Sequence, residues 1–169
     1  MMPMQRMILL LTVFLMASSV AFSQDYKTAD LYFLQGEKEY DSNNKAESGK
    51  MFFQFLKEEK KTGNPRAIKM DDAYRILFFI NREIENLSYR QFIRLSGEHL
   101  DVIEKRNNLP LVDVVNMVTG LRKFKTQKKH LLIIERIKVL MTKINPNDKS
   151  TFELLECEEK RHLKTLKNN

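Results

Sequence analysis

The amino-acid sequence predicts an all-α protein, a bundle of six or seven helices. Apolar residues recur at three- and four-residue steps along most of the chain, a spacing typical of amphipathic helices. An alternation of apolar and polar residues, which would indicate a strand, never persists for more than four residues. Only five Gly and four Pro occur among 169 residues, and this composition argues against a turn-dense β fold.

The first half of the chain is expected to hold three helices. The first covers Tyr26–Tyr40 and ends at Asp41–Asn44, whose polar side chains compete for backbone hydrogen bonds. The second contains the apolar block Met51–Leu56 and ends at the following Gly and Pro. The third, Arg66–Glu83, includes the run Ile76–Ile80, which is apolar on all sides. Such a helix needs neighbours on several sides.

Four more helices are expected in the second half. The fourth, Ser88–Arg106, carries apolar residues on one face, and the fifth begins at Pro110. The sixth, Gln127–Ile144, is apolar over more than half of its circumference and therefore also needs several neighbours. The last begins with Ser150 and Glu153 at the spacing of a capping box.

The N-terminal segment has the pattern of a secretory signal peptide. The apolar run Met7–Met16 follows one positive charge, and small residues precede a cleavage site after Ser23. An uncleaved anchor is the alternative, but the run is short for a span of about 20 residues. We therefore expect a signal peptide over residues 1–23, a helical core domain over 24–145, and a C-terminal helix with a basic tail over 146–169.

An exported chain with a single cysteine cannot be held together by an internal disulfide. Cys157 lies between Glu156 and Glu158, an acidic setting that does not activate a thiol, so it is an incidental thiol or an intermolecular bridge. The two helices that are apolar almost all round then need other partners. Either amphipathic helices surround a central one, or a homodimer completes the core in trans.

Motifs for catalysis are missing from the sequence. The glycines are scattered and form no phosphate-binding loop, and the three histidines, His99, His130 and His162, share no metal-ligand spacing. The acidic pairs Asp71-Asp72 and Glu158-Glu159 are expected on solvated helix faces, and His99 is expected to be packed and hydrogen-bonded. The sequence thus predicts a non-enzyme without catalytic, cofactor-binding or metal-binding residues.

The net charge is +7, and its strongest cluster is the basic run Arg122–His130, while the C-terminal tail is more diffusely basic. For an exported chain, heparan sulfate or an acidic membrane is a better match than nucleic acid, and a solvated helix junction is an equal alternative. Asn86-Leu87-Ser88 is a glycosylation sequon, which makes Asn86 a candidate acceptor. The candidate anion-binding residues are Arg122, Lys123, Lys125, Lys128, Lys129, Lys160, Arg161, Lys164 and Lys167.

Several segments, in the same order, resemble interferon gamma. The expected mature start Gln24-Asp25-Tyr26, the block Gly49–Lys57 and the helix entry Arg66-Ala67-Ile68 are similar to segments of that family. Similar stretches follow at Asn107–Pro110 and at Gln127-Lys128-Lys129. The resemblance implies a helical cytokine fold of class II, an intertwined homodimer, and a secreted ligand that brings cell-surface receptors together in immune and antiviral signalling. It also implies receptor contacts at Asp41, Ser42, Asn43, Asn44 and Lys45.

Two further hypotheses remain open. The chain could be an exported bacterial α-helical scaffold or repeat module, because Tyr32, Gly36 and Phe52 are spaced loosely like a tetratricopeptide helix pair, although no 34-residue period recurs. It could also be an anion-binding antimicrobial or glycosaminoglycan-binding protein, in which the basic run makes the contacts.

Overall fold

The structure is a computed structural model that describes residues 26–125 and 127–168. These residues form helices joined by short connections and no strand, so the predicted all-α class is confirmed. The predicted signal peptide, residues 1–23, lies outside the described residues. In the part of the chain that is described, none of the helices combines the length and apolar character needed to cross a membrane.

The chain divides into two compact units between Pro65 and Arg66. The boundary predicted at residue 145 falls within the second unit, in the connection between its last two helices. The first unit is a helical hairpin made of residues 26–41 and α2 (Lys45–Glu59). The predicted polar break lies between the two helices, and Asn43 adopts a left-handed backbone with φ of 59°.

Aromatic rings fill the inside of this hairpin. The ring of Phe33 lies edge-on to those of Phe52 and Phe55, with centroids 5.5 and 5.0 Å apart. Gly36 is buried under the Phe52 ring, and its carbonyl accepts a hydrogen bond of 2.8 Å from the Ser48 hydroxyl. These contacts tie the two helices together over their central turns.

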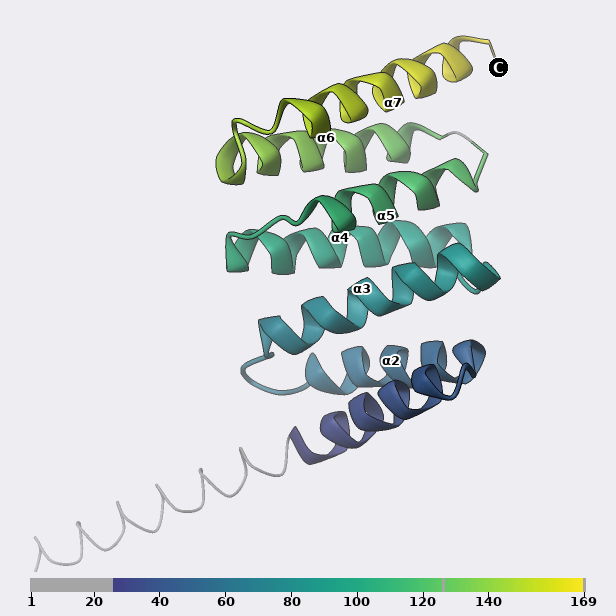
Figure 1. Ribbon diagram of the computed structural model, residues 1–169, viewed down its shortest axis with the longest axis vertical. Helices are drawn as coiled ribbons and strands as arrows, with labels where there is room; N and C mark the ends of the chain where they lie inside the picture. Colours follow the sequence, from purple (N-terminus) through teal and green to yellow (C-terminus); the bar gives the residue numbers. More distant parts are fainter. Residues whose placement is uncertain (1–25, 126, 169) are drawn as a thin grey trace, which may run out of the picture. The chain divides into compact units, whose positions relative to one another are not determined.

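The second unit contains five helices, of which α5 is the shortest, with 12 residues. Figure 1 shows that they form two layers, with α3, α5 and α7 in one layer and α4 and α6 in the other. Their bounds are α3 (Ala67–Ile84), α4 (Tyr89–Arg106), α5 (Leu111–Arg122), α6 (Lys128–Ile144) and α7 (Lys149–Lys167).

The helices of the second unit are stacked in the order of the chain. α3 packs against α4 and α5, α4 packs against α6, and α7 packs against α5 and α6. Substantial contacts among the described helices therefore join elements one or two steps apart along the chain. The connections between these helices are short, which favours packing between elements that are near one another in the sequence.

Local signals in the sequence explain where these helices begin and end. Ser88 and Gln91 form a capping box at the start of α4, and Asn107, with φ of 50°, ends that helix in the left-handed conformation. The capping box predicted at Ser150 and Glu153 is wrong. α7 begins earlier because the Asp148 side chain accepts a hydrogen bond from the Thr151 amide.

The two helices predicted to be enclosed differ in their surroundings. In α3, Leu77 and Ile80 are fully buried, and the ring of Phe78 meets that of Phe92 in α4 at 5.3 Å. In α6, however, Leu132 and Val139 are 63% and 54% exposed. The apolar circumference of α6 is therefore only partly covered, because its neighbours α4 and α7 leave one face open.

Candidate functional site

A buried polar network joins α3, α4 and α5. Asp71, His99 and Asp113 come from these three helices in turn, and each is at most 1% exposed. The Nε2 atom of His99 lies 2.7 Å from Oδ1 of Asp71. Asp71 also pairs with Arg106 and, at 2.9 Å, with Arg75. The expectation that Asp71 faces solvent is wrong, because the packing of α4 against α3 brings His99 and Arg106 to its carboxylate.

His99 is neutral in this network. Burial lowers its pKa to about 4. A neutral ring bonded through Nε2 to a carboxylate donates a proton from that nitrogen. The rings of Tyr74 and Phe78 stack on the imidazole at 5.2 and 5.7 Å. The prediction that His99 is packed and hydrogen-bonded is confirmed.

The same residues could offer ligands to a metal ion, since one atom each from Asp71, His99 and Asp113 lies within 4.8 Å of the others. The carboxylates are already occupied, however. Arg75 donates from Nε and Nη2 to the two oxygens of Asp113, at 2.8 and 3.0 Å, and Arg75 and Arg106 both bind Asp71. Two guanidinium groups balance the two carboxylates. A metal ion would have to displace them, so the donor set fits a structural network rather than a metal centre.

A second buried cluster lies where α4, α6 and α7 approach one another. The imidazole of His130, which is fully buried, meets that of His162 at 4.9 Å and the ring of Tyr89 at 5.4 Å. Neither ring nitrogen of His130 has a hydrogen-bond partner. Burial, the neighbouring His162 and the charge of Arg161 lower the pKa of His130 to about 4. Two histidines that are distant in sequence are thus neighbours in space.

Several predicted anion-binding residues instead have partners within the protein. Arg122 and Arg161 both bind Glu158, a residue that is only 2% exposed. The expectation that Glu158 is solvated is wrong for this reason. The Lys123 ammonium donates to the carbonyl of Arg82 at 2.8 Å and pairs with Glu85 at 3.1 Å, at the C-terminal end of α3.

The other predicted cations are exposed. Lys160 lies 4.0 Å from Glu156 on α7, a weak surface pair. The remaining exposed cations are Lys125, Lys128, Lys129, Lys164 and Lys167. The basic run is therefore divided between cations that stabilise the fold and cations that face solvent.

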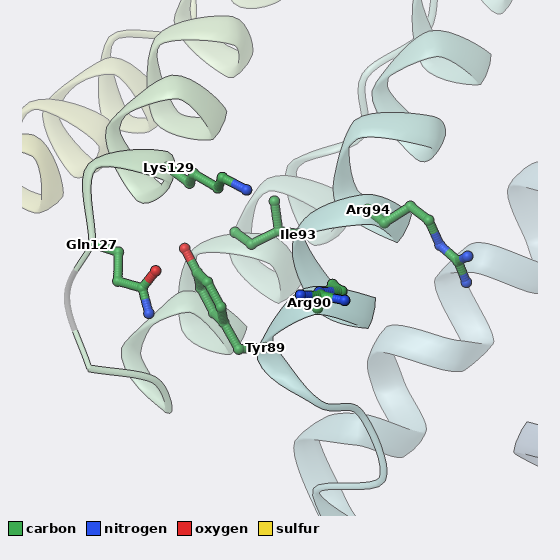
Figure 2. Close-up of a pocket in the computed structure, with 6 residues that line it drawn as sticks. All are labelled: Tyr89, Arg90, Ile93, Arg94, Gln127 and Lys129. Atoms are coloured by element: carbon green, nitrogen blue, oxygen red, sulfur yellow. The ribbon is translucent and has the colours of Figure 1, made fainter.

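One of the exposed cations, Lys129, lines a hollow between the N-terminal ends of α4 and α6. The hollow has a volume of about 510 Å³, within the range of about 300–1,000 Å³ of small-molecule sites. Figure 2 shows Lys129 reaching from α6 towards α4, and Gln127 on the connection that leads into α6. The α4 residues that line it are Tyr89, Arg90, Ile93 and Arg94.

The chemistry of the hollow is cationic with an apolar floor. Arg94 lies 3.9 Å from Glu98, and Figure 2 shows its guanidinium pointing away from the hollow. Arg90 and Lys129 have no carboxylate partner among the described residues. The Tyr89 hydroxyl is buried without a hydrogen-bond partner, and burial raises its pKa, so it remains a proton donor.

The other predicted sites lie elsewhere in the structure. Asp41, Ser42, Asn43 and Asn44 are exposed in the turn of the first unit, and Lys45 begins α2 half-buried. Asn86 is half-buried between α3 and α4, and its side-chain oxygen has no partner. Cys157 is an exposed free thiol on α7. None of these residues lines the hollow.

The chain has no detectable match to a protein-family model, to a curated protein or to a solved structure.

Proposed function

We propose that this chain is an exported, non-catalytic interaction module built from stacked helices, which binds a protein partner. The observation that supports this proposal is the packing order of the second unit. Its helices alternate between two layers and contact neighbours one or two steps along the chain. Stacked-helix proteins share this pattern, and they use the long faces of the stack to bind other proteins.

The packing favours the scaffold hypothesis over the cytokine hypothesis. An intertwined dimer of the interferon-gamma type leaves part of each core to be filled by the second chain. Here three of the five residues in the most apolar run of α3, namely Leu77, Phe78 and Ile80, are already buried within one chain. For α3, therefore, the packing gives no reason to require a second copy, and the exposed Leu132 and Val139 of α6 remain the face that a dimer or a partner could cover.

The polar groups support a binding role rather than catalysis. The buried carboxylates Asp71, Asp113 and Glu158 are held in ion pairs with arginines. A general acid or base needs a group that is free to exchange a proton with a substrate. The buried carboxylates of this unit are instead committed to the contacts between its helices.

Selection from a random peptide library displayed on phage, against the folded chain from Gln24 onward, tests the proposal. We expect enrichment of peptides with a shared motif, and one-to-one binding of a synthetic peptide by calorimetry. A chain unfolded in urea serves as the control target. Failure to enrich any motif on the folded chain would contradict the module. Enrichment of the same peptides on the unfolded control would contradict it equally.

A further inference from the structure

We propose that the hollow between α4 and α6 binds an oxyanion, a carboxylate or phosphate group carried by a segment of the protein partner. This inference rests on the proposed function and names the chemistry of its partner. The hollow is defined by Tyr89, Arg90, Ile93, Arg94, Gln127 and Lys129.

Charge is the first argument for an oxyanion. Arg90 and Lys129 approach the hollow from two different helices, and no carboxylate among the described residues pairs with either. Arg94 also lines the hollow, but its guanidinium points away from it and lies 3.9 Å from Glu98, so the argument rests on Arg90 and Lys129. Two cations that line one hollow from different helices attract an anionic group placed near both.

Hydrogen-bond donors are the second argument, and they are independent of charge. The Tyr89 hydroxyl is buried and has no partner, and Figure 2 shows it pointing towards the space between Gln127 and Lys129. A buried hydroxyl without a partner costs about 1–3 kcal/mol. An oxyanion would accept its proton, and the same anion would lie near the start of α6, where no side chain caps the first amides.

The walls of the hollow indicate a segment rather than a free ion. The ring of Tyr89 and the side chain of Ile93 give it an apolar floor, and about 510 Å³ is far more than one oxyanion fills. A side chain that ends in a carboxylate or phosphate would place its stem on this floor. The apolar atoms add affinity, and the polar groups fix orientation.

A protein segment also fits better than a membrane surface or a glycosaminoglycan chain. Those polyanions need a wide field of accessible cations. Arg122 is bound to Glu158, and Lys123 is bound to carbonyls at the end of α3. The exposed lysines Lys125, Lys128, Lys164 and Lys167 do not line the hollow. The cations left at the hollow form a small site, which suits one anionic group.

The test is a titration of the chain from Gln24 onward, followed by backbone amide shifts in NMR, with inorganic phosphate and sodium acetate as probes. We expect saturable shifts at Gln127, Lys128 and Lys129 with at least one probe. The probe that binds more tightly then shows whether the hollow prefers a phosphate or a carboxylate group. Peptides with a central phosphoserine, glutamate or glutamine extend the comparison, and the glutamine peptide is expected to bind weakest.

Two variants locate the site. The double variant Arg90→Ala, Lys129→Ala is expected to weaken binding of the better probe by roughly tenfold or more. Tyr89→Phe, which removes only the hydroxyl, is expected to weaken it by roughly threefold to tenfold. The matched control, Lys164→Ala with Lys167→Ala, removes the same charge from exposed positions on α7 and is expected to change binding less than twofold. Circular dichroism checks that every variant is folded.

Several results would overturn the inference. These are absence of saturable shifts with both probes, or equal loss of binding in the hollow variant and in the α7 control. A peptide motif from the phage selection that binds the Arg90→Ala, Lys129→Ala variant as tightly as the wild type would reject the hollow and leave the module intact. Sedimentation with phosphatidylserine vesicles that depends on Arg90 and Lys129 would instead assign the site to a membrane.

Discussion

Asp71 of α3 accepts a hydrogen bond of 2.7 Å from the imidazole of His99 in α4. The same carboxylate binds Arg75 one turn along its own helix and Arg106 at the far end of α4. Because Arg75 also forms an ion pair with Asp113 of α5, one connected set of charges spans three helices. We interpret this network as the set of polar contacts that holds α3, α4 and α5 together.

Removing Asp71 should be strongly destabilising. Asp71→Ala leaves two guanidinium groups and a buried imidazole without their shared acceptor, so we expect a loss of about 3–5 kcal/mol in the free energy of unfolding. Asp72→Ala is the matched control, because the Asp72 side chain is 45% exposed and its contact with Arg75 is long, at 3.5 Å. We expect this variant to lose about 0.5 kcal/mol or less in the free energy of unfolding. Urea denaturation measures both, and equal losses would contradict the network.

Stability should fall between pH 7 and pH 5. The pKa values of His99 and His130 are lowered to about 4 in the folded protein, whereas the unfolded imidazoles keep about 6.5. Between these values the unfolded chain binds more protons, so stability decreases as pH falls. We expect lower urea midpoints at pH 5 than at pH 7. A midpoint that is constant or rises towards pH 5 would contradict the lowered pKa values.

The variant His130→Phe separates the contribution of His130. Phenylalanine keeps a ring against Tyr89 and removes two buried nitrogens that lack partners. We therefore expect the free energy of unfolding at pH 7 to be unchanged or raised by about 1 kcal/mol. We also expect this free energy to decrease less between pH 7 and pH 5 than it does in the wild type. The urea midpoints at both pH values measure this. A decrease as large as in the wild type would show that His130 does not titrate as described.

Two helical glycines, Gly97 in the middle of α4 and Gly120 in the last turn of α5, should respond in opposite directions to alanine. A Cβ on Gly120 of α5 would overlap the ring of Phe92 in α4, whereas a Cβ on Gly97 would meet nothing within 4 Å. We expect Gly120→Ala to cost about 1–3 kcal/mol through overpacking, and Gly97→Ala to add about 0.5–1 kcal/mol through helix propensity. Thermal melting of both variants measures the difference, and two equal shifts would contradict the packing of α5 on α4.

Two lysines of the basic run should differ in their effect on stability. The Lys123 ammonium is bonded to the Arg82 carbonyl and paired with Glu85, while Lys125 is exposed. Lys123→Ala is expected to cost about 1 kcal/mol because carbonyls at the end of α3 lose a cation. Lys125→Ala is expected to be neutral in the same urea titration. Equal effects would mean that Lys123 only adds to the surface charge.

Local signals in the sequence predict the helices well. The fourth helix was expected over Ser88–Arg106 and is found over Tyr89–Arg106, since a capping box and a left-handed asparagine mark its ends. The start of α2 at Lys45 was missed, because the apolar block that predicted this helix begins only at Met51. Polar residues before an apolar block do not show whether the helix has already begun.

Contacts between helices were much harder to predict. Asp71 was expected in solvent because the adjacent pair Asp71-Asp72 reads as a charged face, and its partner His99 lies 28 residues away. The hollow was missed for a similar reason. Of the cations that line it, only Lys129 belongs to the basic run, whereas Arg90 lies on α4 and reaches the same space through the packing of α4 against α6.

Sedimentation equilibrium of the chain from Gln24 onward, at micromolar concentration and neutral pH, tests the central claim most directly. The claim is that one chain buries its own core as a stack of helices and binds its partner as a module. We therefore expect the mass of a folded monomer, with circular dichroism showing full helicity. A dimer that persists on dilution, and that loses its helicity when it dissociates, would contradict the claim and favour the intertwined cytokine fold.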